Sequence, residues 1–310
     1  MGKGVAMPRK PKADSLDLFV PDLIVAGDLH AGNLKPECRD DDYLDTLCGK
    51  VEQIAKLQAV YGCPVVFPGD LFDFWKADSV LLNRLLAVWP KGPVLGVPGQ
   101  HDLPQHNLEL LEKTGFQTLV RSGKLFDVSA GEYAHAGYTV FGAAWDMVPA
   151  TPDCSNAAVL VWHVTTWEKP FAPGQKPGEA TRLLKANKGW DLIVTGDNHQ
   201  TFECQDGNRS LLNAGSVMRK TSDQIDHRPC VYLWRRDGKW EKRYLRIDPQ
   251  AVTRDTVERE KAKEKRRDAF VEKLAGDGEV SLSFDDNVDG LLATEEDTVV
   301  KRLTLECCGR

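Results

Sequence analysis

The feature that most constrains the fold of this chain is a short apolar run that ends in a polar cluster, repeated five times. The runs are Leu23–Ala26, Pro64–Phe67, Pro93–Val97, Val159–Trp162 and Leu192–Val194. Each is too short for a helix and is followed within two residues by glycine or histidine, in four of the five cases together with acidic or amide side chains. Apolar runs of this kind are typical of buried β-strands, so we expect five strands that each end in polar residues.

Helical periodicity lies between these runs. From Tyr43 to Ala55 apolar side chains recur every three or four residues, aspartates precede the segment, and Gly62 follows it as a helix-ending residue. Similar patterns occur at Leu81–Val88, Leu108–Leu111 and Ala180–Ala186. Strands that alternate with helices indicate an α/β fold.

Later in the chain the pattern changes to hairpins. Apolar segments flank Asp206-Gly207 and, further on, Asp237-Gly238, which are strong hairpin turns. After Pro249 charged residues dominate, and Arg254–Lys273 is predicted to be a helix with charge pairs four residues apart. We therefore divide the chain into three parts: a polar N-terminal tail over residues 1–20, a domain over 21–248, and a charged helical C-terminal extension over 249–310 that forms oligomer contacts or a solvated face.

Composition excludes several classes of protein. Lys and Arg number 40 against 46 Asp and Glu, a net charge of −6, so no basic excess indicates nucleic acid or an anionic membrane surface. The apolar run Leu81–Trp89 contains Arg84 and is shorter than the roughly 18 residues of a membrane span. No apolar stretch follows the basic residues 9–12, so we expect no secretory signal and a cytoplasmic location.

The residues that carry chemistry stand directly after the five predicted strands. They are Asp28-x-His30, Gly69-Asp70-Leu71-Phe72-Asp73, Gly99-Gln100-His101-Asp102, His163, and Gly196-Asp197-Asn198-His199. In open α/β sheets ligands bind outside the carboxyl ends of the strands, so these clusters should converge on one edge. Carboxylates and imidazoles that meet there are suited to divalent metal ions.

This order and spacing resemble the calcineurin-like metallophosphoesterase superfamily, whose motifs run D-x-H, G-D-x-x-D, G-N-H-D/E, H and G-H-x-H. The resemblance covers about residues 22–220 and is nearest to the DNA-repair exonuclease branch, in a phage or bacterial form. It implies a four-layer α/β/β/α sandwich with a dinuclear metal site at the strand ends.

The resemblance also implies a role for each motif residue. Asp28, His30 and His199 would hold the first metal, Asp70 would bridge, and Gln100, His163 and Asp197 would complete the second site. His101 would be the proton donor, oriented by Asp102.

For two further residues, two different roles are left open. Asp73 either accepts a hydrogen bond from a ligand histidine or caps its turn. The segment from Asn213 resembles the N-P-G-S segment of the nuclease and phosphodiesterase branches, and within it Arg219, with Lys220, either meets substrate phosphate or lies in a solvated turn.

Two positions depart from the family pattern, and both belong to the second metal. Gln100 stands where asparagine is usual, and Asp197 stands where the first histidine of G-H-x-H is usual. The harder, more anionic donors favour Mn²⁺, with Mg²⁺, Fe²⁺ and Zn²⁺ left open. A site with a single metal also stays open.

The resemblance implies a metal-dependent phosphoesterase that hydrolyses a phosphate ester with a metal-activated hydroxide. A phosphodiester substrate is favoured, and nucleic acid cleaved in the manner of a DNA exonuclease is included. Two alternatives are kept: a small-molecule phosphomonoesterase, and a non-catalytic binding module on a decayed metallophosphoesterase frame. We expect no membrane partner.

Overall fold

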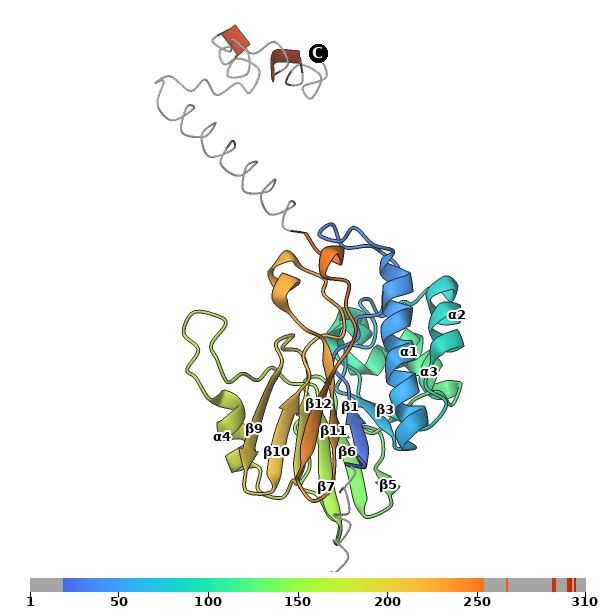
Figure 1. Cartoon of the computed structure of the whole chain (residues 1–310), viewed down its shortest axis with the longest axis vertical. Helices are drawn as coiled ribbons and strands as arrows, with labels where there is room; N and C mark the ends of the chain where they lie inside the picture. Colours follow the sequence, from blue (N-terminus) through green and yellow to red (C-terminus); the bar gives the residue numbers. More distant parts are fainter. Residues whose placement is uncertain (1–18, 254–265, 267–291, 294–299, 303, 305–310) are drawn as a thin grey trace, which may run out of the picture. The chain divides into compact units, whose positions relative to one another are not determined.

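The computed structural model describes residues 19–253, 266, 292–293, 300–302 and 304 (Figure 1). The chain divides into one unit over residues 1–253 and a second over 254–310. Most of the expected N-terminal tail and of the helix Arg254–Lys273 lies outside the described residues, so the helical extension and its role in oligomer contacts stay predictions. Within the described residues, no helix has the length and hydropathy needed to cross a membrane.

The first unit is a mixed α/β structure, as the sequence predicts, and it contains two six-stranded sheets. The first sheet has the order β12-β11-β1-β2-β3-β4, with β1 Leu23–Val25, β2 Val65–Phe67, β3 Val94–Gly96, β4 Phe126–Asp127, β11 Cys230–Trp234 and β12 Trp240–Tyr244. The second has the order β5-β6-β7-β8-β10-β9, with β5 Tyr133–His135, β6 Tyr138–Ala143, β7 Ala157–Trp162, β8 Leu192–Thr195, β9 Phe202–Asp206 and β10 Arg209–Asn213. Both predicted hairpins are present, as the antiparallel pairs β9/β10 and β11/β12.

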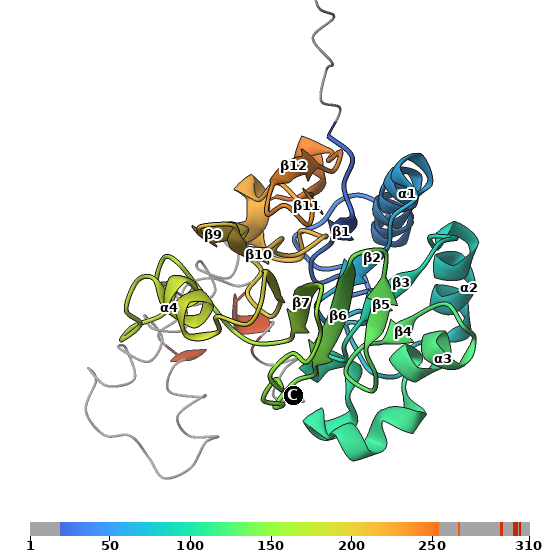
Figure 2. The same ribbon diagram turned by 90° about the horizontal axis from the view of Figure 1, so that it is seen from below.

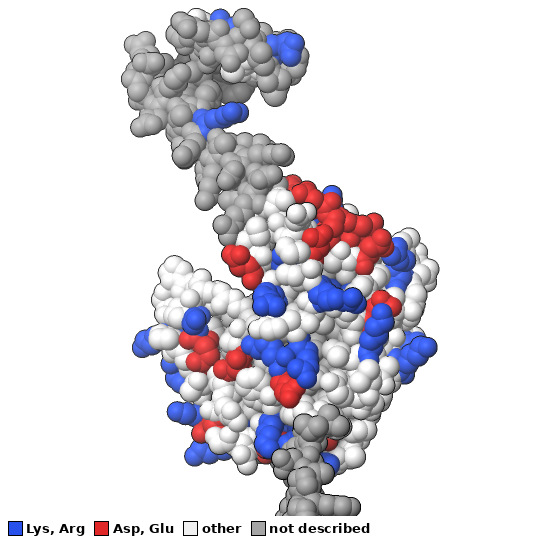
Figure 3. Space-filling view, viewed as in Figure 1, with Lys and Arg blue, Asp and Glu red and all other residues white. Residues whose placement is uncertain are grey.

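Most helices lie at the predicted positions. They are α1 Tyr43–Tyr61, α2 Ser79–Val88, α3 Gly115–Arg121 and α4 Glu179–Ala186, with 3₁₀ turns η1 Gln100–Asp102, η2 Pro104–His106, η3 Leu108–Lys113, η4 Ser222–Asp226 and η5 Pro249–Ala251. The helix expected at Leu108–Leu111 is a 3₁₀ turn, and α3 follows it. At the start of α1, Asp42 accepts a hydrogen bond from the backbone N–H of Asp45 at 2.9 Å, and acidic side chains gather over this end (Figure 3). Negative charge there complements the helix dipole.

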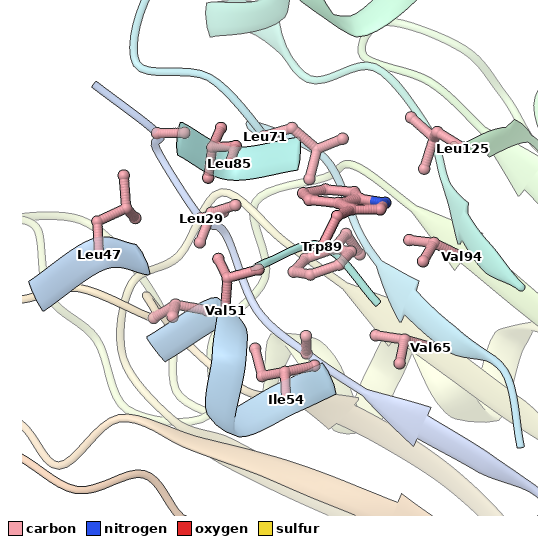
Figure 4. Packing of buried hydrophobic residues seen from close by; sticks show 14 of the residues in the cluster. Leu29, Leu47, Val51, Ile54, Val65, Leu71, Leu85, Trp89, Val94 and Leu125 are labelled. Carbon is pink, nitrogen blue, oxygen red and sulfur yellow. The ribbon is translucent and has the colours of Figure 1, made fainter. Parts of the chain in front are cut away.

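Three separate apolar cores show that the unit has four layers. Ile24 of β1 belongs to a core between the first sheet and the helices α1 and α2 (Figure 4), whereas its neighbours Leu23 and Val25 face the second sheet. This alternation follows from the two-residue period of a strand. A third core, which includes Leu184 and Ile193, lies beneath α4. Figure 2 shows α1 and α2 outside one sheet and α4 beside β9 and β10 of the other, which gives the expected α/β/β/α order.

Buried cations hold the last part of this unit, residues 246–253, against its body. Lys50 of α1 donates to the backbone oxygen of Arg246, and Arg219 donates to that of Asp248. Arg39 in turn donates to the backbone oxygen of Arg219 at 2.8 Å. All three cations are buried. The segment is therefore fixed by charge-assisted hydrogen bonds as well as by the apolar side chain of Val252.

Lys50 should make the stability of the protein depend on pH. Burial, and then the charges of Arg219 and Arg39, lower the pKa of Lys50 from 10.5 to about 8. Between these two pH values the unfolded chain binds more protons than the folded one, so the free energy of unfolding rises with pH. We expect the free energy of unfolding of the wild type, relative to that of Lys50→Met, to rise by roughly 2–3 kcal/mol between about pH 7.5 and about pH 10.5. Urea unfolding at a series of pH values measures this difference. A difference that stays constant with pH would contradict this.

Candidate metal centre

The five polar clusters meet at the carboxyl ends of strands from both sheets. Asp28, Asp70 and Gln100 follow β1, β2 and β3 of the first sheet, whereas His163 and Asp197 follow β7 and β8 of the second. The edge predicted from the sequence is thus shared by two facing sheets. A site of this kind is held rigidly, because five buried strands position it.

The first group of predicted ligands consists of Asp28, His30 and His199. The Nε2 atoms of His30 and His199 are 2.9 Å apart, and His199 Nε2 is 3.9 Å from Asp28 Oδ2. One donor atom from each of the three residues lies within 4.8 Å of the others. Residues far apart in the sequence therefore form one compact donor set.

The second group consists of Asp70, His163 and Asp197, again with donor atoms within 4.8 Å of one another, and Gln100 joins it. His163 Nδ1 donates to the backbone oxygen of Pro68 at 2.8 Å, which leaves Nε2 to face the group. That Nε2 is 2.6 Å from Gln100 Oε1 and 3.6 Å from Asp70 Oδ2.

Asp70 lies between the two groups. Its Oδ2 is 3.6 Å from His30 Nε2 of the first group and 3.6 Å from His163 Nε2 of the second. Its Oδ1 accepts a hydrogen bond from the backbone N–H of His101 at 2.9 Å, which fixes the orientation of the carboxylate. A single carboxylate oxygen is thus directed at two sets of donors.

The donor atoms fit divalent metal ions. Asp28 Oδ1 and Asp70 Oδ2 are buried and have no hydrogen-bond partner among the described residues. Buried polar atoms are normally paired, and an unpaired carboxylate oxygen is costly. Carboxylate, imidazole and amide donors at such distances are the usual ligands of first-row divalent cations.

The backbone at the site is unusual in ways that explain the motif glycines. His30, Asp70 and Asp197 all have positive φ angles, of 45°, 45° and 66°. Residues in this left-handed region cost of order 1–3 kcal/mol each and cluster at functional sites. A Cβ atom on Gly69 would lie 2.1 Å from His163 Nδ1, and one on Gly99 would lie 2.2 Å from Asp70 Oδ1. Only glycine allows the ligands to come this close.

Burial and neighbouring charges raise the pKa of some of these groups and lower the pKa of others. Burial raises the pKa of Asp28 well above its usual value. Burial also opposes ionisation of Asp70, but the neighbouring imidazoles, chiefly that of His163, hold its pKa at about 2. For His199, burial and then the charge of His30 lower the pKa to about 4. At neutral pH these shifts leave His199 neutral and Asp70 ionised, the forms that bind cations, whereas the raised pKa of Asp28 favours its protonated form.

The predicted partnership of His101 and Asp102 is wrong. Asp102 is fully buried and accepts three backbone hydrogen bonds, from Leu71, Phe72 and Gly99, at 2.8–3.1 Å. Through these hydrogen bonds the carboxylate of Asp102 fixes the loop that carries Asp70. The ring of His101 is exposed, and its Nδ1 is 3.0 Å from the backbone oxygen of Asp73. That carbonyl orients His101, so the tautomer with the proton on Nδ1 is the one favoured.

The side chain of Asp73 lies beside His30, at a distance longer than a hydrogen bond. Its Oδ1 is 3.6 Å from His30 Nδ1, and the same oxygen accepts a hydrogen bond from Lys220 Nζ. Lys220 therefore lies beside the site, and its charge contributes to keeping the pKa of Asp73 low. Asp73 and Lys220 thus form an ion pair next to Nδ1 of His30, and the predicted hydrogen bond from this histidine to Asp73 stays a prediction.

Arg219 does not have the predicted role of substrate contact. Its side chain is buried and donates to the backbone oxygens of Ile225, at 3.0 Å, and Asp248. A guanidinium that pairs with backbone carbonyls in the interior cannot also reach a phosphate at the surface. The alternative of a solvated turn is equally wrong, because Arg219 has a structural role.

The two residues that depart from the family pattern contact each other. Gln100 Nε2 donates to Asp197 Oδ1, and this hydrogen bond turns Gln100 Oε1 toward His163. Asp197 Oδ2 accepts a hydrogen bond from Thr165 Oγ1, a residue that the sequence analysis missed because a lone threonine after a strand carries no signal. A direct hydrogen bond therefore links the two residues that depart from the family pattern.

No protein-family model and no curated protein matches this sequence. Among solved structures, the chain is similar to the protein TT1561 of Thermus thermophilus at 14% identity, over 74% of this chain and 100% of that one, with a TM-score of 0.45. It is also similar to the phosphopantetheinyl hydrolase PptH of Mycobacterium tuberculosis, at 15% identity over 75% and 98% of the two chains and a TM-score of 0.42. A metallophosphoesterase from Sphaerobacter thermophilus matches at 13% identity over 73% and 89%, with a TM-score of 0.35. Metallophosphoesterases are thus among the solved structures that this chain resembles.

Proposed function

We propose that this protein is a metal-dependent phosphoesterase of the calcineurin-like metallophosphoesterase superfamily. The observation that carries the proposal is the position of Asp70, whose Oδ2 is 3.6 Å from a histidine of each donor group. A carboxylate shared by two donor sets is suited to bridging two cations. The order of the motifs along the chain and the four-layer fold support the same conclusion.

The proposed metal-binding residues divide between the two cations. Asp28, His30 and His199 would hold the first, and Gln100, His163 and Asp197 the second, with Asp70 shared. Bound divalent cations supply an activated water nucleophile and neutralise charge that develops on the phosphoryl oxygens. The oxygen-rich second group, with its amide and two carboxylates, favours Mn²⁺ over Zn²⁺.

His101 is the proposed proton donor to the departing alcohol. Its Nδ1 is held by the backbone oxygen of Asp73, and its ring lies edge-on to His30 with centroids 4.9 Å apart. The imidazole is therefore fixed beside the donor groups while it remains exposed to substrate. Because Nδ1 is held by that carbonyl, Nε2 is the ring atom that can carry the proton to the departing oxygen.

The test is hydrolysis by the full chain with and without added metal. We expect Mn²⁺ to activate the cleavage of bis(p-nitrophenyl) phosphate and of p-nitrophenyl phosphate, with the diester preferred, and EDTA to abolish it. Elemental analysis should give two Mn²⁺ per chain. Turnover of the monoester alone would favour the phosphomonoesterase. Absence of both metal and turnover would overturn the proposal in favour of a non-catalytic binding module.

A further inference from the structure

Backbone strain in the described part of the first unit is confined to the donor groups and two loops beside them. Six residues other than glycine have positive φ angles there: His30, Asp70, Gln105, His106, Asp146 and Asp197. Three of the six are candidate ligands. The other three have φ angles of 52°, 57° and 61°. They belong to two loops, over residues 100–108 and 143–150, that are far apart in the sequence. Strain of this kind persists where the surrounding structure enforces a functional geometry.

These two loops meet at the candidate metal centre. The ring of His106 lies edge-on to that of Trp145, with centroids 6.5 Å apart. The ring centroid of Trp145 in turn lies 6.2 Å from that of His163, a candidate ligand. The backbone N–H of Trp145 donates to the backbone oxygen of Pro98 at 3.1 Å, directly before Gly99-Gln100. The strained residues thus place two aromatic rings in a row that starts at the donor groups.

The loops are anchored, but their rings remain accessible. Trp162 Nε1 donates to the backbone oxygen of Met147 at 3.1 Å and fixes the loop that follows Trp145. Trp145 is half-buried and His106 is exposed. Val148, three residues after Trp145, is 87% exposed, so the same loop also presents an apolar side chain to solvent.

The charge of the two loops restricts what they can hold. Residues 100–108 and 143–150 contain no Lys or Arg, and the second stretch includes Asp146. A polyanion such as a nucleic acid strand is bound mainly by basic side chains, which these loops do not supply. A neutral planar ring, in contrast, gains from stacking on tryptophan and histidine.

We infer that Trp145 and His106 form a specificity wall that holds a planar aromatic or heteroaromatic ring in the organic group of the substrate. The inference rests on the proposed phosphoesterase function and names the substrate class. The phosphate of such an ester lies at the donor groups, and the ring lies against Trp145.

The test compares ethyl phosphate with 2-phenylethyl phosphate, or the corresponding diesters, because both leaving groups are simple alcohols of similar acidity. We expect wild-type kcat/KM to favour the phenylethyl ester by about tenfold. Trp145→Ala should reduce this ratio to near one, His106→Ala should reduce it in part, and Trp145→Phe should preserve it. Phe126→Ala removes an exposed aromatic ring of β4 and should leave the ratio unchanged.

The outcomes separate this inference from the function on which it rests. If the wild type hydrolyses both esters at equal kcat/KM, the specificity wall is wrong and the phosphoesterase stands. If Trp145→Ala slows both esters equally, Trp145 is structural and the inference is overturned. If no divalent cation supports turnover of either ester or of bis(p-nitrophenyl) phosphate, the proposed function fails and the inference fails with it. If bis(p-nitrophenyl) phosphate is cleaved but 2-phenylethyl phosphate and its diester are not, the inference alone is overturned.

Discussion

Replacement of Asp70 by asparagine should lower kcat/KM for phosphoester hydrolysis by roughly a thousandfold. The two side chains have the same shape, so Asp70→Asn keeps the hydrogen bond that the backbone N–H of His101 donates to Oδ1. What is lost is the negative charge that lies 3.6 Å from both His30 and His163. The measurements are kcat/KM at saturating Mn²⁺ and the metal content of the purified variant, which should fall below two ions per chain.

A matched control is available in Asp127→Asn. Asp127 is also a buried aspartate, but its Oδ1 accepts hydrogen bonds from the N–H and hydroxyl of Ser129, and it is not among the donor groups. Asparagine keeps this acceptor, so activity should stay within about threefold of the wild type. Near-normal turnover by Asp70→Asn, with Asp127→Asn also active, would remove Asp70 from the proposed mechanism.

Replacement of Gly99 by alanine should have the second largest effect. The added Cβ would lie 2.2 Å from Asp70 Oδ1 and 2.4 Å from the backbone nitrogen of Asp70. Because backbone atoms cannot move aside cheaply, Asp70 itself must shift, and we expect kcat/KM to fall by roughly a hundredfold. Unfolding in urea should show a loss of about 1–3 kcal/mol.

Gly49→Ala is the control for this change. Gly49 lies inside α1, and an added Cβ there meets nothing within 4 Å. Alanine at this position should leave activity unchanged and raise the free energy of unfolding by about 0.5–1 kcal/mol. If Gly99→Ala behaves like Gly49→Ala, the close packing of Gly99 against Asp70 is not what positions the carboxylate.

The sequence predicted the location of the site because the signal is local. Short apolar runs followed by Asp, Gln or His mark strand ends, and the carboxyl ends of neighbouring parallel strands share an edge. Asp28, Asp70 and Gln100 come together for this reason. A second sheet was expected only because the order of the motifs resembles a family with a four-layer fold. Composition and periodicity alone do not show whether the later strands form a separate sheet or continue the first.

The predictions that failed concern where side chains point. His101 and Asp102 are adjacent in sequence, but they lie on a 3₁₀ turn, where successive side chains diverge by about 120°. Asp102 therefore faces the interior while His101 faces solvent. Arg219 similarly depends on backbone carbonyls supplied by Ile225 and Asp248, which sequence spacing does not reveal.

The region between residues 103 and 156 was the least predictable part of the domain. Apart from the helix at Leu108–Leu111, no element was predicted there, and the region contains α3, β4, β5 and β6. β4 spans only Phe126–Asp127, too short to give a periodic signal. β6 is longer, but Gly142 interrupts its pattern, and its strand character depends on pairing with β7.

The way residues 246–253 are held has a practical consequence for anyone who shortens this chain for crystallisation or binding studies. Residue 248, the end of the domain predicted from the sequence, is the wrong place to cut. Val252 pairs with Arg39, and the N–H of Thr253 donates to the backbone oxygen of Cys38 at 2.8 Å. A protein that stops at Asp248 would lose these contacts and loosen the carbonyl that Arg219 holds, directly beside Lys220 and its pairing with Asp73. A chain that stops after Thr253 retains them all.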